Sequence, residues 1–248
     1  MRAPLMRRRL SVFDPLTLSP TLWLPSDAGA ITIATGVSQW DDSSGNGYHF
    51  TQGTGGAQPA HNATGGPNST SIVTSDGTDD CLVSTATLEN VIDADGYMID
   101  MIVKLVAAPD FYDSNDANCF NNEAIITDSA AYLEVAVAKT GPRLQCGHFG
   151  AAQGTAGQTI ATGTWYRVRF MYDGTDISAK IGSASPVTAT VGNVAVLTGT
   201  MSLFKQYLGA TFVSAALAEL IAFDYAPSAG DRTNIDSYYT SKFGPGLL

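Results

Sequence analysis

The amino-acid sequence predicts an all-β protein: an antiparallel sandwich followed by one short helix near the C-terminus. Three observations favour this fold class. Short segments alternate apolar and polar residues at the period of a strand, and only one segment has helical spacing. The chain of 248 residues contains 25 glycines, together with many serines and threonines that suit strands and turns. Only 15 % of the residues are charged, against about 25 % in an ordinary soluble domain.

The clearest strand pattern lies within residues 97–107, where apolar side chains alternate with Asp100 and Lys104. The apolar positions that share one face are Tyr97, Ile99, Met101, Val103 and Leu105. Residues 165–182 predict a hairpin, because the dipeptide at 173–174 is Asp-Gly, a strong turn signal. Further strands are expected at residues 133–137, 187–191, 201–208 and 217–223.

One helix is predicted at residues 228–243. Ser228 can cap its start, with Asp231 three positions later, and Gly244 followed by Pro245 can end it. We expect this helix to pack on an edge or end of the sandwich. Residues 41–70 are rich in glycine and almost free of apolar runs, which indicates a loop.

Basic residues gather at the start of the chain, and residues 1–12 form a predicted basic arm. Four of the 13 basic residues lie there: Arg2, Arg7, Arg8 and Arg9. The net charge of the chain is −10, so without the four arginines of this arm the remaining residues have a net charge of −14. A body this acidic repels phosphates, which argues against nucleic acid as a partner. We expect the arm to contact an acidic neighbour, such as another copy of this body. Folding back on its own domain and binding nucleic acid are the alternatives.

Export and membrane insertion are not indicated. No apolar run of signal-peptide type follows the basic start, and no stretch of about 18 uninterrupted apolar residues exists. Cys81, Cys119 and Cys146 are far apart and odd in number, so they predict neither a disulfide framework nor a zinc site.

Three blocks of sequence carry a family resemblance. The first consists of residues 22–24, 37–47 and 76–80, the second of residues 163–174, and the third of residues 217–224 with the helix after them. In this order and spacing they resemble the concanavalin A-like, laminin-G-like jelly-roll family, and in particular members encoded by tailed bacteriophages. The resemblance implies a single laminin-G-like domain over residues 13–248, folded as an antiparallel concanavalin A-like jelly roll. Trp23, Trp40 and Trp165 stand at its motif positions and are expected in the core.

The resemblance does not fix one function, because the family includes virion components, calcium-dependent binders, glycan-binding modules and glycosidases. The first expectation is a non-enzymatic structural protein of a tailed-phage virion, as a capsid decoration, head fibre or tail surface component. It would be made in the host cytoplasm and bind copies of itself and other virion proteins. The alternative is a calcium-assisted module that binds host-surface glycans for adhesion.

A glycoside hydrolase or lyase is the least favoured class. Glycosidases need two carboxylates that flank the scissile bond. The four glutamates, Glu89, Glu123, Glu134 and Glu219, do not stand in the Glu-x-Asp-x-Glu arrangement of sandwich glucanases. The Gly-x-Ser-x-Gly motif of serine hydrolases is also absent from the sequence. No catalytic residue is therefore assigned.

Two groups of side chains predict binding sites. Calcium prefers clustered carboxylate and carbonyl oxygens on a flexible loop. Its candidate ligands lie on two turns that we expect to converge: Asp41, Asp42 and Asn46 on one, and Asp76, Asp79 and Asp80 on the other. The same residue types also stabilise turns through their own backbone, which remains an alternative.

Aromatic side chains beside polar ones are the second group, because rings stack on the apolar faces of sugars. The glycan-binding candidates are Tyr48, His49, Phe111 and Tyr112. Anchoring of these loop aromatics in the core or in a subunit contact is the alternative.

Overall fold

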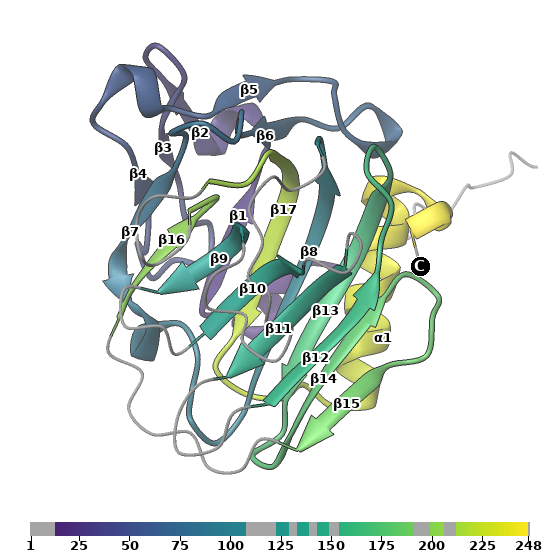
Figure 1. Cartoon of the computed structure of the whole chain (residues 1–248). Coiled ribbons are helices and arrows are strands. Elements are labelled where there is room, and N and C mark those ends of the chain that lie inside the picture. The colour runs from purple at the N-terminus through teal and green to yellow at the C-terminus, as the bar shows by residue number, and fades with distance from the viewer. Residues whose placement is uncertain are drawn as a thin grey trace, which may run out of the picture.

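A computed structural model gives the fold of the protein (Figure 1). It describes residues 13–107, 123–128, 133–138, 143–148, 154–190, 199–205 and 212–247, and within 123–157 it describes the backbone only. The predicted basic arm, with its four arginines, lies outside the described residues.

Within the described residues, eight strands form the first sheet, called sheet A. All of its strand pairs are antiparallel. Seven strands follow one another across the sheet, and β1 (Leu22–Pro25) pairs with β17 beside them. Their order is β15 (Val187–Thr190), β14 (Asp176–Ile181), β13 (Trp165–Tyr172), β8 (Tyr97–Leu105), β17 (Ala215–Phe223), β6 (Ile72–Thr74) and β5 (Ala60–Asn62).

Nine strands of the described residues form the second sheet, called sheet B, also with antiparallel pairs. Their order is β12 (Gly154–Thr159), β11 (Arg143–His148), β10 (Leu133–Ala138), β9 (Glu123–Asp128), β16 (Thr200–Leu203), β7 (Leu82–Thr87), β4 (Phe50–Thr51), β3 (Val37–Trp40) and β2 (Ile31–Ile33). Short 3₁₀ turns lie at η1 (Pro15–Leu18), η2 (Ala28–Ala30), η3 (Gly55–Ala57), η4 (Pro67–Ser69), η5 (Leu88–Asn90) and η7 (Pro245–Leu247).

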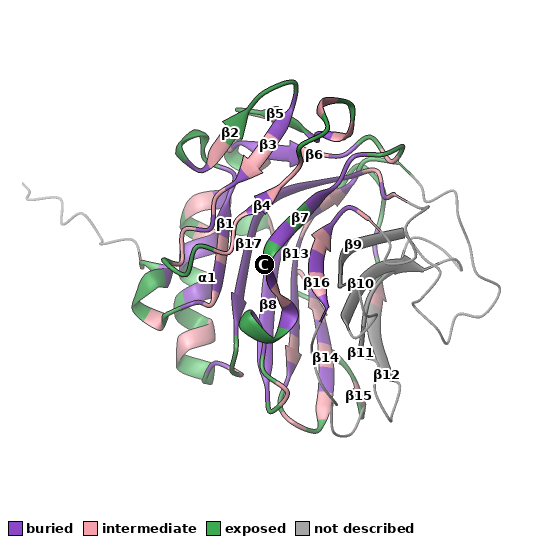
Figure 2. Ribbon diagram, turned by 90° about the vertical axis from the view of Figure 1, so that its left-hand side faces the viewer, coloured by how far each residue is buried: buried purple, intermediate pink, exposed green. Residues whose placement is uncertain are grey.

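The two sheets pack face to face, and the main core lies between them (Figure 2). The five apolar side chains that alternate along β8 all point into this core and are fully buried. The same holds for Val168, Phe170 and Tyr172 of β13, whose hairpin with β14 turns at Asp173 and Gly174. The predicted antiparallel β-sandwich is therefore confirmed.

The helix α1 (Ala229–Phe243) begins and ends where the sequence predicts. The hydroxyl of Ser228 accepts a hydrogen bond from the backbone N–H of Asp231 at 3.2 Å. At the other end, Gly244 has φ of +89°, a left-handed conformation that glycine adopts without strain. Both caps stop the helix within one residue of the predicted bounds.

The position of α1 differs from the prediction of an edge or end. The helix covers the outer face of sheet A, and a second apolar cluster fills the space beneath it (Figure 2). This cluster joins Met98 and Ile102 of β8 and Ile221 and Phe223 of β17 to the buried side of α1. All nine residues of β17 are buried, as expected for a strand covered on both faces.

Two further segments differ from the sequence prediction. Residues 41–70 contain β4 and β5 rather than loop alone. These strands are two and three residues long, too short to show a period of two in the sequence. The strand expected at 201–208 is also shorter, because β16 ends at Leu203 and Phe204 turns away with φ of +66°.

Candidate functional site

A buried network of charged side chains joins sheet A to α1. Asp100 of β8 is fully buried on the outer face of the sheet. Arg167 of β13 contacts both of its carboxylate oxygens, at 3.0 and 2.7 Å, and Arg169 donates to Oδ2 at 2.7 Å. Both arginines also reach Asp236 of α1, each at 2.8 Å. This network fixes the helix to the sheet.

The arginines decide the charge of Asp100. Burial alone would raise the pKa of this carboxyl group, but the adjacent Arg167 and Arg169 lower it below its ordinary value. Burial would likewise lower the pKa of Arg167, yet the Asp100 carboxylate raises it. Both groups are therefore held in their charged forms, because each is the other's partner.

A second buried carboxylate lies nearby, on β17. Glu219 is fully buried, with Trp23 of β1 donating to Oε1 at 2.9 Å and Tyr238 of α1 at 2.7 Å. Its Oε2 accepts a hydrogen bond from Nζ of Lys242 at 2.6 Å. Burial raises the pKa of Glu219, and these three donors oppose that rise. Burial alone would lower the pKa of Lys242, but Glu219 raises it.

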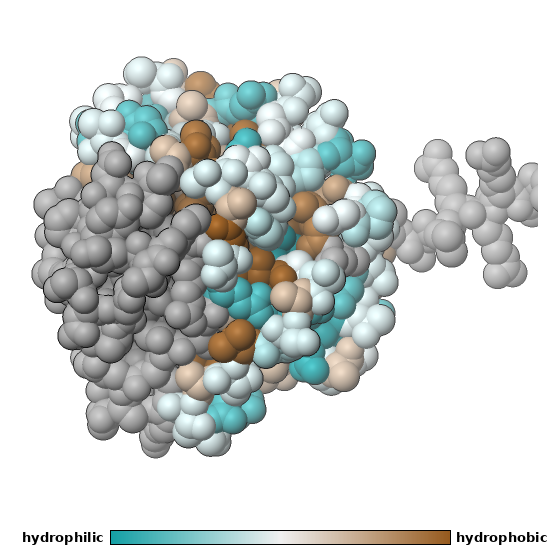
Figure 3. Space-filling view, turned by 45° about the vertical axis from the view of Figure 1, so that its right-hand side comes forward, coloured by the Kyte–Doolittle hydropathy of each residue, from teal (hydrophilic) through white to brown (hydrophobic). Residues whose placement is uncertain are grey.

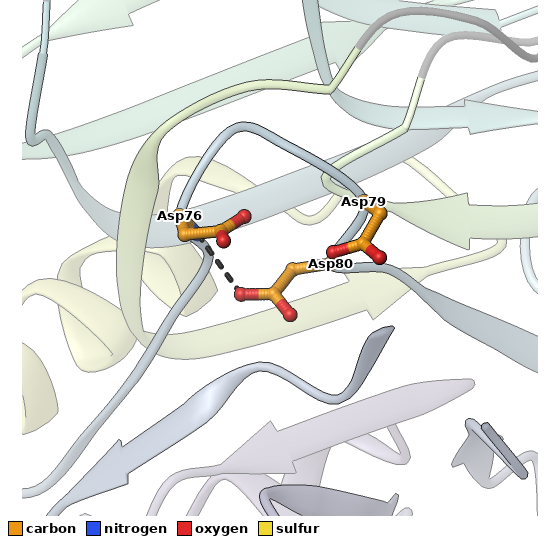
Figure 4. A group of neighbouring side chains, drawn as sticks. All are labelled: Asp76, Asp79 and Asp80. Carbon is orange, nitrogen blue, oxygen red and sulfur yellow. Dashed lines mark hydrogen bonds between the residues drawn. The ribbon is translucent and has the colours of Figure 1, made fainter. Parts of the chain in front are cut away.

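The acidic loop between β6 and β7 brings together three of the predicted calcium ligands. Ligand oxygens of Asp76, Asp79 and Asp80 all lie within 4.8 Å of one another (Figure 4). Asp80 is buried and accepts a hydrogen bond from the backbone N–H of Asp76 at 2.9 Å. Burial raises the pKa of Asp80, and the charges of Asp76 and Asp79 raise it further. Among the described residues, this is the one cluster of three acidic, histidine or cysteine side chains close enough to hold a metal ion.

The other three predicted calcium ligands form no such cluster. Four donors point at the two oxygens of Asp42: the backbone N–H groups of Trp23, Ser44 and Tyr48, and the hydroxyl of Ser44. A carboxylate has about four acceptor positions, so this loop already uses those of Asp42.

The neighbouring side chains of this loop also have partners within the protein. Asp41 accepts a hydrogen bond from Gln39 at 2.6 Å, and the Asn46 side chain donates to the backbone oxygen of Thr21 at 3.0 Å. These contacts match the alternative in which Asp and Asn residues stabilise the turn.

The two acidic loops do not form one cluster of ligands. The acidic loop leads into the first residue of β7, Leu82. The loop of residues 41–49 contacts the middle of that strand, where the backbone N–H of Thr85 donates to the carbonyl oxygen of His49 at 2.9 Å. Three residues of strand, from Leu82 to Thr85, span about 10 Å, and among the described residues only Asp76, Asp79 and Asp80 bring their ligand oxygens together.

The predicted glycan-binding aromatics are described only in part. Tyr48 is half-buried and packs against the main core. Nδ1 of His49 lies 3.1 Å from the backbone N–H of Asp42 and 3.2 Å from Oδ1 of Asp41. A backbone N–H can only donate, so Nδ1 is the acceptor of the hydrogen bond from Asp42. In this arrangement Nδ1 carries no proton that it could donate to Asp41. Phe111 and Tyr112 lie outside the described residues.

A cavity of about 400 Å³ beside Trp165 was not predicted. It is bounded by the start of β13, the β14–β15 turn and η7, and polar lining is supplied by Thr159, Thr164 and Ser183. Trp40 is fully buried as expected, whereas Trp165 is half-exposed. The sequence did contain a signal: Trp165 shares the outer face of its strand with Arg167, at a spacing of two.

No protein family matches the sequence, and no curated protein sequence matches it either. Solved structures share the fold. The receptor-binding domain of botulinum neurotoxin type G matches with a TM-score of 0.61 and 14 % identity, over 87 % of this chain and 51 % of that chain. The binding domain of botulinum neurotoxin DC, in complex with rat synaptotagmin II, gives 0.61 and 11 %, over 91 % and 53 %. Trypanosoma rangeli sialidase gives 0.59 and 10 %, over 90 % and 33 %.

These matches define the class of the protein as an antiparallel β-sandwich with a C-terminal helix. The chain spans about half the length of the neurotoxin domains and about a third of the sialidase. At such low identities the likeness concerns the fold, which proteins of different function share. No helix among the described residues has the length and apolar character to cross a bilayer.

Proposed function

We propose that this protein is a non-enzymatic surface component of a tailed-bacteriophage virion, built on a concanavalin A-like, laminin-G-like jelly roll. One observation supports this most: the three sequence blocks that carry the phage resemblance meet in space. Trp23 of the first block contacts Glu219 of the third at 2.9 Å, and Asp42 accepts from the backbone of Trp23 at 3.0 Å. Arg169 of the second block reaches Asp236 of the following helix at 2.8 Å.

The blocks therefore act as one structural unit. Residues far apart in the sequence form the joint of β1, β17, β13 and α1. This joint supports the proposal of a rigid scaffold, which would be made in the host cytoplasm and assembled with its own copies and other virion proteins.

The test is mass spectrometry of purified virions of a phage that encodes this chain, with an epitope-tagged chain located by immunogold labelling. We expect the chain in stoichiometric amounts on the particle surface. If mass spectrometry does not detect the chain in purified virions, the proposal is rejected.

A glycan-binding adhesion module is the second candidate, favoured by the cavity at Trp165. Its volume of about 400 Å³ falls in the range of about 300–1,000 Å³ that is usual for ligand pockets. The half-exposed Trp165 ring lines this cavity, and Nζ of Lys104 lies over the ring at 4.8 Å from its centroid. The ring offers apolar contact to a sugar, and the hydroxyl groups around it offer hydrogen bonds. Calcium at the acidic loop would assist such binding. A glycan array probed once with calcium and once with a chelator tests glycan binding and its dependence on calcium. An array without bound protein in either condition rejects the candidate.

Hydrolysis of glycans is supported least. The two carboxylates that sheet A buries, Asp100 and Glu219, are enclosed under α1 and paired with cations. Neither can reach a scissile bond in solvent. The side chain of Glu134 lies outside the described residues, although its backbone belongs to β10. Loss of a glycosidase activity in Glu134→Gln would be the minimum support for this class.

A further inference from the structure

The outer face of the β13–β14 hairpin carries a row of cations that α1 leaves partly uncovered. Because side chains alternate along a strand, Trp165, Arg167 and Arg169 share this face. The register places Lys180 of β14 directly opposite Arg169. Two like charges in directly opposed positions repel each other unless an anion lies between or above them.

A groove runs along this row. Arg169 and Lys180 line a cavity of about 270 Å³ against the first turns of α1, where Arg232 and Asp236 form the opposite wall. The same two cations line a water-sized space of about 10 Å³ with Gly182. Gly182 in turn lines the cavity of about 400 Å³ at Trp165. The cavities therefore adjoin one another in a line.

Local geometry explains why the groove exists. The backbone N–H of Gly182 donates to the carbonyl of Arg167 at 2.9 Å, so Gly182 is the position opposite this arginine. Having no side chain, it leaves space where any other residue would cover the sheet. Figure 3 brings the α1 side of the molecule forward, where hydrophobic and hydrophilic side chains lie next to one another.

The charge of the groove is opposite to that of the whole protein. It contains four cations and two carboxylates, in a chain of net charge −10. The cations are Arg167, Arg169, Lys180 and Arg232, and the carboxylates are Asp100 and Asp236.

The acidic groups next to the groove have other partners. Asp231 bonds the Ser228 hydroxyl at 2.7 Å, and Asp176 accepts from Thr190 at 2.6 Å.

Within the part of the chain that the structure describes, Lys180 has no counter-ion. Its ammonium group makes no hydrogen bond or ion pair with any other described residue, whereas both carboxylates of the groove are shared between Arg167 and Arg169. The Arg232 guanidinium donates to the carbonyl oxygen of Pro227 and to Sδ of Met171, so these contacts involve no carboxylate. The first turn of α1 adds the partial positive charge of a helix N-terminus. An excess of positive charge therefore faces the open side of the groove.

We infer that this groove binds an acidic oligosaccharide, with an anionic substituent at Arg169, Lys180 and Arg232 and a sugar ring at Trp165. Trp165 and Arg169 are four residues apart on one strand, about 13 Å, a span for a short oligosaccharide rather than a single sugar. This inference rests on the glycan-binding candidate above and names its site and ligand class.

The experiment titrates the full chain by calorimetry with oligosaccharides of equal length. The probes are an oligogalacturonate, which carries carboxylates, a heparin-derived oligosaccharide, which carries sulfates, and a neutral dextran fragment. We expect at least one acidic probe to bind more than tenfold tighter than the neutral probe at low salt. A single-stranded DNA oligonucleotide of matched charge tests for unspecific attraction of polyanions.

Two variants with the same charge change locate the binding. Lys180→Gln removes the unpaired cation of the groove, and Lys205→Gln removes a cation at the end of β16, which lies in the other sheet. We expect about tenfold weaker binding for Lys180→Gln, the effect of one hydrogen bond to a charged group. Lys205→Gln should bind as the wild type does. Trp165→Ala should weaken binding of the acidic oligosaccharide, because it removes the ring on which a sugar would stack.

Each other result overturns the inference. Equal weakening by both lysine variants would mean that net charge, not the groove, attracts the probe. DNA that binds as tightly as the sugars would make the groove a site for any polyanion. Absence of binding by both acidic probes rejects the inference, while a neutral glycan that binds would still leave the adhesion candidate standing.

Discussion

Nζ of Lys242 lies 2.6 Å from Oε2 of Glu219, so the last turn of α1 is joined by a buried ion pair to β17. The Glu219 side chain has no exposed surface, and that of Lys242 is 17 % exposed. Trp23 and Tyr238 complete the shell of donors around the carboxylate. The charge on Glu219 is therefore tolerated in an apolar layer only while its cation is present.

Replacing Lys242 by Met should destabilise the protein by about 3 kcal/mol, because it leaves a buried carboxylate without its cation. The double variant Glu219→Gln/Lys242→Met should recover part of this loss, since the neutral amide can still accept from Trp23 and Tyr238. Urea unfolding followed by tryptophan fluorescence measures both. Lys205→Met is the matched control, and a Lys242→Met variant no less stable than this control contradicts the prediction.

The ion pairs of the buried Asp100 should make the stability of the protein depend on pH in the acid range. Burial opposes its ionisation, but Arg167 and Arg169 lower the pKa of the folded carboxyl below its unfolded value. Its stabilising contribution is thus fully present above the unfolded pKa of about 3.9 and is lost as the pH falls through the folded value. We expect Asp100→Asn to be about 3 kcal/mol less stable than wild type at pH 7, where it leaves two arginines short of a partner.

The difference between wild type and Asp100→Asn should narrow progressively below about pH 3.9. Urea unfolding of both proteins at a series of pH values measures it. A difference that stays constant down to pH 2 would show that lost packing, rather than lost charge, explains the variant.

The fold was predictable where the strands are long. β8 and β13 each have several alternations of apolar and polar residues, so their inner faces could be read from the sequence. The sequence also contained a signal for the position of α1, because the apolar run of β17, interrupted only by Glu219, indicates burial on both faces. The short strands β4 and β5 gave no signal, because two and three residues are too few to show a period of two.

The candidate sites were predictable only where the ligating residues are neighbours in the sequence. Asp76, Asp79 and Asp80 share one turn, so their clustering follows from local spacing. The groove depends on the register that places Lys180 opposite Arg169. The turn signal at residues 173–174 predicts the hairpin, but the register also depends on the length of the loop, which that signal alone does not give. Glu219 offered one clue, a single charge within an apolar run, which in a buried strand requires a partner.

Calcium should raise the midpoint of thermal unfolding of the wild type, because an ion that binds the folded state alone stabilises it. In calcium-free buffer, Asp79→Asn should be at least as stable as wild type, since it relieves the repulsion that raises the pKa of Asp80. With millimolar calcium, the unfolding midpoint of this variant should rise much less than that of the wild type. Asp224→Asn, at an exposed acid elsewhere, is the control. A wild-type midpoint that calcium leaves unchanged would identify the loop as a turn without a bound ion.

Deleting residues 1–12 should convert an oligomer of the full chain into a monomer. The arm contributes four arginines, and the rest of the chain carries a net charge of −14 that another copy presents to it. Attraction of this kind is screened within about 10 Å at 0.1 M salt, so high salt should have the same effect as the deletion. Light scattering of both forms at low and high salt measures the mass. A full-length variant with all four arginines replaced by glutamine separates the role of charge from that of length. If the full chain is a monomer at every salt concentration, the arm does not drive assembly, and the virion proposal must rest on contacts of the sandwich itself.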